Sequence, residues 1–129
     1  MTAWTPIHHP EHVPRPTGPY TPAVRAGDLV FVSGQVPRSL VTGELVGHDV
    51  ATQTRQTLSN VRDLLREAGA TMSDVVSVTV YLQDADDWAA MNEVYADFFP
   101  SPPPSRTTVG AELRGILVEI SAIAHAPAS

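Results

Sequence analysis

The stretch DVATQTRQTLSNVRDLLREAGA at residues 49–70, followed by VVSVTVYL at residues 75–82, decides the fold class. The first part carries apolar and small side chains on one stripe at helical spacing. Asp49 can cap its start and Gly69 can end it, so a helix is predicted over residues 49–68. The second part is rich in β-branched residues and long enough to be a central strand.

Further elements are expected on both sides of this pair. Strands are predicted at residues 23–25, 29–33, 106–111 and 116–124. A turn at Gly27–Asp28 makes the first two a hairpin, and Asp86 can cap a second helix whose apolar face runs to Pro100. The order hairpin, helix, strand, helix, strand, strand predicts an α+β fold, with a mixed sheet and both helices on one face.

Such an arrangement leaves the second face of the sheet uncovered. In the strand at residues 75–82 one expected face is purely aliphatic and the other is only partly polar. The two sets are Val76, Val78, Val80 and Leu82, and Val75, Ser77, Thr79 and Tyr81. An exposed, partly apolar sheet face is a candidate subunit interface, so we predict a homo-oligomer.

Composition excludes several chemistries. The chain has 129 residues, no Cys, and eight basic residues that are all Arg, so thiol nucleophiles, disulfides, Cys-based zinc sites and lysine Schiff bases are absent. A net charge of −6 argues against nucleic acid or anionic membrane as a partner. No stretch is apolar enough to span a bilayer, and the start lacks a signal-peptide core, so a cytoplasmic protein is expected.

The prolines form two clusters. Six lie within residues 6–22 and four within PSPPPS at residues 100–105, and both clusters predict loops or extended chain. We expect a Pro-rich N-terminal arm over residues 1–17 and a single domain over residues 18–129. Three histidines, His8, His9 and His12, lie on the arm, where nothing aligns them as ligands, so no metal site is expected.

Seven short segments follow one another along most of the chain. They are GPY at 18–20, VSGQVP at 32–37, TGELV at 42–46, QTR with LSN within 53–60, MNEVY at 91–95, SRTTV at 105–109 and VEI at 118–120. In this order and spacing they resemble the RidA/YjgF family of small trimeric proteins, over residues 18 to 124.

The resemblance implies a chorismate-mutase-like α+β fold, a ferredoxin-like arrangement, assembled as a homotrimer with active sites between subunits. It also implies hydrolytic deamination of 2-imino and 2-enamino acids, such as 2-aminoacrylate and 2-iminobutanoate, to 2-keto acids and ammonia. No cofactor is expected for this reaction. Two alternatives stay open: a module that binds small carboxylates without turnover, and an endoribonuclease, against which the net charge argues.

Three residues are the expected catalytic group. Arg106 could be a surface arginine paired with an acid, but the resemblance implies that it binds the substrate carboxylate. Glu119, in an otherwise apolar strand, could form an interface ion pair, whereas the resemblance implies that it orients the attacking water and accepts its proton. Tyr20 either fixes the arm to the domain or places its hydroxyl in the cleft.

Four further residues are expected to bind substrate. Ser33 and Gly34 end an apolar strand, where a simple turn is the alternative and the resemblance implies backbone close to the ligand. Asn92 is either a local hydrogen-bonding residue or part of the cleft. Thr108 is expected to offer its backbone N–H to the carboxylate.

Two departures from the family pattern border the expected cleft. The loop PSPPPS at residues 100–105 is shorter than usual and lacks the aromatic residue that often precedes the arginine. Residues 113–115, Leu-Arg-Gly, stand where the family commonly has Leu-Pro. Both departures bear on the range of substrates.

Overall fold

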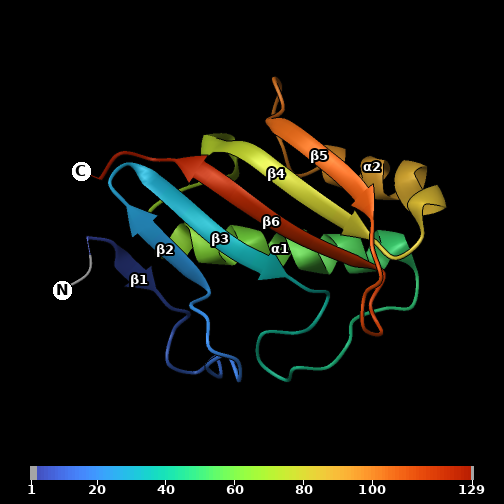
Figure 1. The fold of residues 1–129 in the computed structure, drawn as a ribbon, viewed down its shortest axis with the longest axis horizontal. Coiled ribbons are helices and arrows are strands. Elements are labelled where there is room, and N and C mark those ends of the chain that lie inside the picture. The colour runs from blue at the N-terminus through green and yellow to red at the C-terminus, as the bar shows by residue number, and fades with distance from the viewer. Residues whose placement is uncertain (1–2, 129) are drawn as a thin grey trace.

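A mixed six-stranded sheet carries two helices on one of its faces in the computed structural model, which describes residues 3–128 (Figure 1). The strands are β1 (Thr5–Ile7), β2 (Ala23–Ala26), β3 (Leu29–Gln35), β4 (Val75–Leu82), β5 (Ser105–Gly110) and β6 (Val118–His125). The helices are α1 (Val50–Glu67) and α2 (Trp88–Ala96), with short 3₁₀ turns η1 (Met72–Asp74) and η2 (Ala85–Asp87). The strand order is β1-β2-β3-β6-β4-β5, in which β4 and β5 pair in parallel and all other neighbours are antiparallel. The predicted α+β class with a mixed sheet is confirmed.

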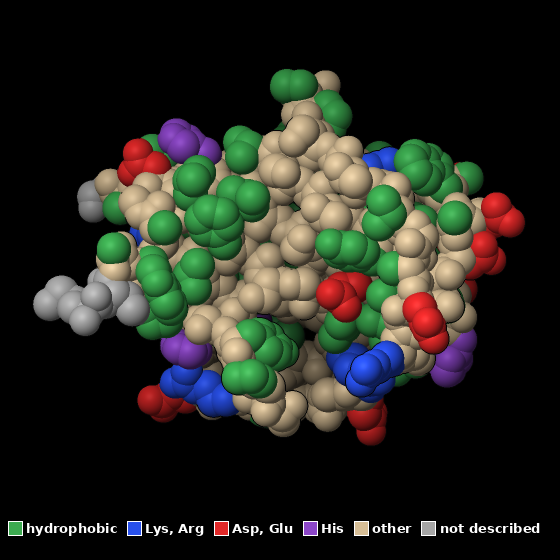
Figure 2. All heavy atoms as spheres, viewed as in Figure 1, with side chains coloured by type: hydrophobic (Ala, Val, Ile, Leu, Met, Phe, Trp, Pro, Cys, Tyr) green, Lys and Arg blue, Asp and Glu red, His purple; other side chains and the backbone are tan. Residues whose placement is uncertain are grey.

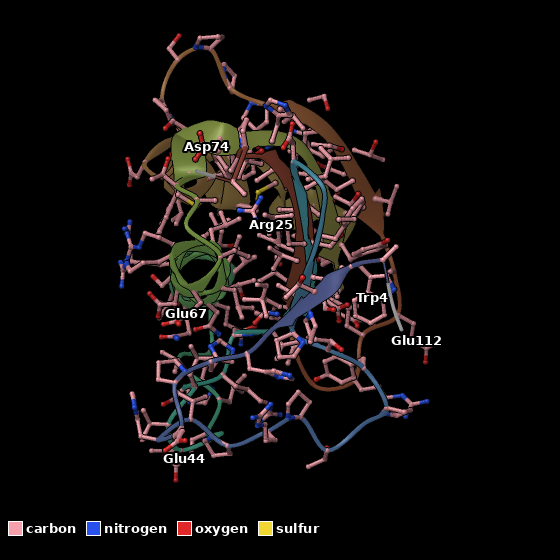
Figure 3. The ribbon with its side chains drawn as sticks, turned by 90° about the vertical axis from the view of Figure 1, so that its left-hand side faces the viewer. Trp4, Arg25, Glu44, Glu67, Asp74 and Glu112 are labelled. Carbon is pink, nitrogen blue, oxygen red and sulfur yellow. The ribbon has the colours of Figure 1, made fainter. Side chains whose placement is uncertain are left out.

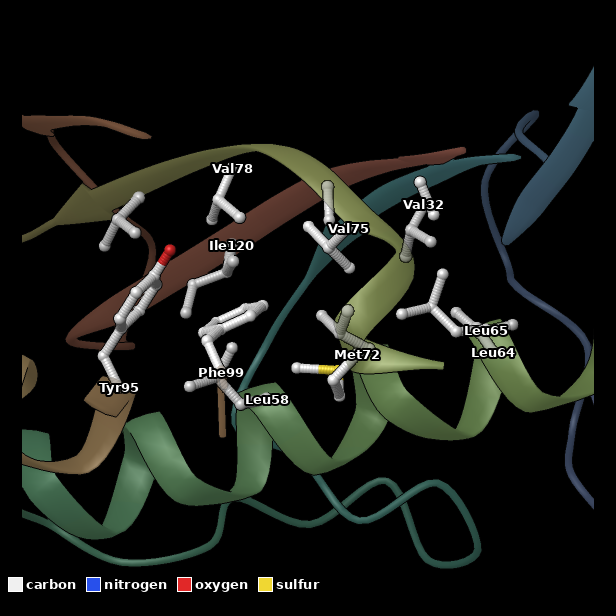
Figure 4. Packing of buried hydrophobic residues seen from close by; sticks show 14 of the residues in the cluster. Val32, Leu58, Leu64, Leu65, Met72, Val75, Val78, Tyr95, Phe99 and Ile120 are labelled. Carbon is white, nitrogen blue, oxygen red and sulfur yellow. The ribbon is translucent and has the colours of Figure 1, made fainter. Parts of the chain in front are cut away.

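Helix α1 forms where its sequence pattern predicts it. Asp49 caps the first turn, because its carboxylate accepts hydrogen bonds from the Thr52 amide at 2.9 Å and the Thr52 hydroxyl at 2.8 Å. Gly69 follows the helix with φ of 80°, a backbone conformation that other residues rarely adopt. The stripe that includes Leu58, Leu64 and Leu65 is fully buried against the sheet (Figure 4).

A bulge at the start of β4 changes which side chains face the helices. Val75 pairs with Ala124, yet Ser77 pairs with Ile123, so the extra residue Val76 is displaced. Val75 is therefore buried and Val76 is 48% exposed. The prediction that Val76 shares a face with the rest of the aliphatic set is wrong, since simple alternation does not register an inserted residue.

The second helix is shorter than predicted. The side chain of Asp84 accepts a hydrogen bond from the Asp86 amide at 2.9 Å and starts the turn η2, so Asp86 is not the cap of α2. The helix ends at Ala96, before Pro100. Phe99 nevertheless remains buried in the core beyond the helix end.

Part of the segment expected to be an arm belongs to the sheet. Thr5–Ile7 forms β1, which pairs antiparallel with β2 at the edge of the sheet. Pro6 is tolerated there because an edge strand has no partner on its outer side.

The two faces of the sheet differ in cover. Figure 3 shows α1 end-on along one side, with Arg25 pointing from β2 toward the helix layer. Arg25 donates to the Ala68 carbonyl, just after α1, at 2.7 Å. Within residues 3–128 no helix covers the other face, which Figure 2 views directly and on which hydrophobic side chains gather over the strands. Its exposed apolar residues include Leu29, Phe31 and Val109.

No helix in the part of the chain that the structure describes has the length and apolar character needed to cross a membrane.

Candidate functional site

Arg106 lies on the helix side of the sheet, at the start of the edge strand β5. It pairs with the buried Val78 of β4, which sets its side chain on the same face. The guanidinium carbon lies 4.7 Å from the ring centroid of Tyr95 and 5.4 Å from that of Trp88, both on α2. Such cation–π contacts hold the guanidinium in place without neutralising its charge. Among the residues described, no carboxylate forms an ion pair with Arg106.

Tyr95 forms the buried wall beneath this arginine. Only 6% of it is exposed, and its ring packs against Phe99 with the centroids 4.5 Å apart. Its hydroxyl makes no hydrogen bond of good geometry within the described chain. Burial raises the pKa of Tyr95 and the neighbouring Arg106 charge opposes this shift, so the phenol is neutral at physiological pH.

Asn92 and Thr108 join Arg106 on this side of the sheet. Asn92 lies one turn before Tyr95 on α2 and lines a cavity of about 440 Å³ together with Arg106. Thr108 follows Arg106 by two residues and pairs with the buried Val80, so its side chain is on the same face. Its hydroxyl is buried and has no hydrogen-bond partner in the described chain.

Glu119 lies on the opposite face of the sheet, against Gly34. It pairs with Tyr81 on β4, one position away from the buried Val118 and Ile120. A methyl group at Gly34 would overlap the Oε2 atom of Glu119 and lie 3.1 Å from its Cδ. The Glu119 carboxylate thus occupies space that a side chain at residue 34 would take.

Ser33 and Tyr20 belong to the Glu119 side. The Ser33 hydroxyl donates to the Thr21 carbonyl at 2.7 Å and ties the strand end to the segment that carries Tyr20. Tyr20 is 58% exposed and lines, with Gly34, a second cavity of about 350 Å³ beside residues 35–43. The Tyr20 side chain is therefore accessible from this cavity.

The seven predicted site residues consequently form two groups. Arg106, Asn92 and Thr108 lie toward the helices, whereas Glu119, Gly34, Ser33 and Tyr20 lie toward the uncovered face or its edge. Strand β4 separates β5 from β6. Within one chain Arg106 and Glu119 extend from opposite faces of the sheet. A site that uses both would need a second copy of the chain.

Two buried amides position the neighbouring loops and were not singled out from the sequence. Gln53 accepts from the Leu117 amide at 2.8 Å and donates to the Gly47 carbonyl at 3.1 Å, which fixes the chain just before Glu119. Asn60 donates to the Val36 and Arg38 carbonyls at 3.0 and 2.9 Å. Both are polar residues on the buried stripe of α1, and that position is the signal that could have identified them.

The aromatic support of Arg106 was also missed as a functional feature. The sequence pattern assigns Trp88 and Tyr95 to the apolar face of α2, and only the structure brings their rings against the guanidinium.

His9 and His12 of the N-terminal segment line a small cavity against the last turns of α1. His9 is partly buried, and burial lowers its pKa, against the opposing effect of Asp63 and Glu67. Within residues 3–128, no group of three or more His, Asp or Glu side chains is arranged to hold a metal ion.

Comparison with known proteins gives consistent matches over nearly the whole chain. The family model described as Endoribonuclease L-PSP matches residues 10–126. A RutC family protein of Pyrococcus horikoshii is 45% identical over 117 residues, covering 89% of this chain and 93% of that protein. A 2-iminobutanoate/2-iminopropanoate deaminase of Dermatophagoides farinae is 40% identical over 112 residues, covering 85% and 88%. The crystal structure of E. coli TdcF with bound serine has a TM-score of 0.84 at 35% identity, covering 92% of this chain and 97% of that one.

Proposed function

The chain belongs to the RidA/YjgF family and has its chorismate-mutase-like α+β fold, and on that premise we propose that it hydrolyses 2-imino acids to 2-keto acids and ammonia. The observation that carries the proposal is Arg106, a charged guanidinium that contacts two aromatic rings, lies beside a cavity and has no carboxylate partner in the described chain. Such a group suits a small carboxylate, which a guanidinium can bind through two parallel hydrogen bonds. The deaminase of Dermatophagoides farinae and the serine bound to TdcF support this class of ligand.

The proposed site joins two subunits of a homotrimer. One subunit contributes Arg106, Asn92 and the Thr108 backbone, and a neighbouring subunit contributes Glu119, Gly34, Ser33 and Tyr20. This assembly accounts for both the separation of the two groups within one chain and the apolar sheet face that no helix covers. Sedimentation of the purified protein as a trimer is the expected result.

The proposed reaction needs only one proton-transfer group and a water molecule. Arg106 binds the substrate carboxylate, and the Glu119 carboxylate takes a proton from water as the oxygen adds to the imine carbon. The nitrogen receives that proton, which gives a neutral tetrahedral carbinolamine. The hydroxyl proton of the carbinolamine then passes to the nitrogen through Glu119, the C–N bond breaks as the C=O bond forms, and ammonia and a 2-keto acid leave. Tyr20 assists proton movement in this scheme. Correct placement of water and substrate supplies the remainder of the acceleration, and no cofactor is required.

The test is imine hydrolysis by wild type and variants. An amino-acid oxidase generates the imine in place, and semicarbazide traps whatever imine the protein has not hydrolysed. We expect Arg106→Ala and Glu119→Gln each to lower kcat/KM by about 10²–10⁴. Arg66→Ala and Glu67→Gln, at two exposed residues near the end of α1, are the matched controls and should keep wild-type rates. If wild type accelerates no imine, the deaminase proposal is wrong.

The description of the family model gives a second candidate, RNA cleavage. The net charge of −6 makes it the weaker one, since RNA binding draws on a surplus of basic side chains. Cleavage of single-stranded RNA that is lost in Arg106→Ala would favour it. Binding of a 2-keto acid without any imine turnover would instead favour a carboxylate-binding module.

A further inference from the structure

The cavity beside Arg106 is larger and more apolar than a small imino acid requires. Its volume is about 440 Å³, within the range of sites that hold drug-sized ligands. It lies between the end of α2, the proline-rich loop and the start of β5. Its walls include Tyr95, Ala96, Phe99, Pro103 and Pro104. An ethyl side chain such as that of 2-iminobutanoate would leave most of this space unfilled.

The cavity is charged only where Arg106 borders it. Of the described residues that line it, Arg106 alone is charged. The floor is formed by Tyr95, a side chain 94% buried whose hydroxyl has no hydrogen-bond partner of good geometry. A ligand with a carboxylate at one end and an apolar group at the other fits this distribution of charge.

On the basis of the proposed function, we propose that this cavity binds the side chain of the substrate and selects 2-imino acids with a bulky apolar group, branched aliphatic or aromatic. The imine carbon is trigonal and carries the carboxylate, the side chain and the nitrogen. With the carboxylate on Arg106 and the side chain in the cavity, the nitrogen is directed away from both. Water held by Glu119 of a neighbouring subunit then adds to one of the two faces of this trigonal carbon.

The short loop supports this assignment. Residues 100–105 contain four prolines and two serines, so no large side chain from the loop enters the space in front of Arg106. The prolines also limit how far the loop can move to fill it. Each additional methylene buried in such a pocket improves binding roughly fourfold.

Ala96 provides a way to close the cavity without touching Arg106. It lies at the end of α2, lines the cavity and is exposed, so a larger side chain there does not disturb the core. Ala89 is a matched control, because it is exposed on the same helix and does not line this cavity.

The experiment compares imines generated from leucine, phenylalanine and 2-aminobutyrate with wild type, Ala96→Phe and Ala89→Phe. Wild type should show a kcat/KM at least tenfold higher for the leucine and phenylalanine imines than for the 2-aminobutyrate imine. Ala96→Phe should lower kcat/KM for the bulky imines tenfold or more and change the small one less than threefold. Ala89→Phe should leave all three rates unchanged.

The outcomes separate this inference from the function on which it rests. Equal rates for all three imines, with Ala96→Phe affecting them alike, would overturn the pocket assignment and leave the deaminase proposal intact. If no imine is hydrolysed, calorimetry with 4-methyl-2-oxopentanoate and 2-oxobutanoate decides the pocket assignment separately. Tighter binding of the branched keto acid that Ala96→Phe abolishes would support it, and equal binding would overturn it.

Discussion

At the scale of single residues, the position of the Glu119 carboxylate depends on the absence of a side chain at Gly34. A methyl group at Gly34 would overlap the end of the Glu119 side chain, which can move, rather than rigid backbone. Gly34→Ala should therefore displace the carboxylate and leave the fold intact. We expect kcat to fall by about 10²–10⁴, as for loss of a general base, with the melting temperature nearly unchanged. Imine-trapping kinetics and calorimetry measure the two quantities.

Gly110→Ala is the control for this substitution. Its new methyl group would lie 3.6 Å from the Cβ of Ala85, an ordinary contact, so activity and melting temperature should both be retained. A fully active Gly34→Ala protein would argue against Glu119 as the proton acceptor.

Trp88 has a different role at this scale, because its ring positions the guanidinium of Arg106. Cation–π contacts of this type contribute about 0.5–2 kcal/mol. Trp88→Leu should therefore raise KM several-fold, because Arg106 loses one of its two rings, and should change kcat little. Trp88→Phe keeps a ring face and should restore most of the affinity. A change in kcat with KM constant would contradict this role for Trp88.

At the scale of elements, the N-terminal cap of α1 makes stability depend on pH. Hydrogen bonds from Thr52 lower the pKa of Asp49 below its ordinary value of 3.8. A carboxyl with a lowered folded-state pKa stabilises the fold above its unfolded pKa and loses that contribution as pH falls through the folded pKa. The melting temperature of Asp49→Ala should therefore lie below that of wild type, and the difference should be the same throughout pH 5–8.

That difference should narrow as the pH falls below about 4, because the unfolded Asp49 carboxyl takes up a proton there, whereas the folded cap does so only at a lower pH. Asp49→Asn keeps an uncharged oxygen acceptor, so its own cap should be independent of pH. Thermal unfolding over pH 2.5–8 measures the three proteins together. If the difference in melting temperature between wild type and Asp49→Ala stays constant down to pH 2.5, the assignment of Asp49 as the cap is wrong.

Elements with strong periodicity were predictable from sequence, and their local exceptions were not. Helix α1 has both a capping residue and a terminal glycine around a continuous apolar stripe, and its predicted span is confirmed to within a residue. The bulge at Val76 depends on strand pairing, and the turn η2, which Asp84 starts and which takes up the Asp86 expected to cap the second helix, depends on competition between adjacent aspartates. Neither of these leaves a mark in the hydrophobic pattern.

At the scale of the whole molecule, a shared site predicts a specific result for mixed trimers. Arg106→Ala and Glu119→Gln should each be nearly inactive alone. In trimers formed from equal amounts of both, about a quarter of the sites combine an intact Arg106 with an intact Glu119. We therefore expect the mixture to recover about a quarter of wild-type activity. No recovery in confirmed mixed trimers would contradict a site shared between subunits.

A second mixture is the control for this result. Wild type combined with an equal amount of the double variant should also give about a quarter of full activity if sites are shared, and about half if each chain holds its own site.

The separation of the candidate site into two groups was not predictable from one sequence. The motifs that resemble the family identify the residues, but they do not say that Arg106 and Glu119 extend from opposite faces of the sheet. That information is in the strand register, which pairs Arg106 with the buried Val78 and Glu119 with Tyr81, two residues on opposite faces of β4. The support of Arg106 by Trp88 and Tyr95 likewise depends on how α2 packs over β5.

The edge strand β1 also has a consequence for solubility. It pairs with β2 over only three residues, and Pro6 at its centre cannot donate a backbone hydrogen bond to any further strand. A short edge interrupted by proline is a poor template for the addition of a strand from another molecule. The sheet is thus blocked at this end against continuous growth into fibrils. A chain that lacked β1 would expose the longer backbone edge of β2 to that risk.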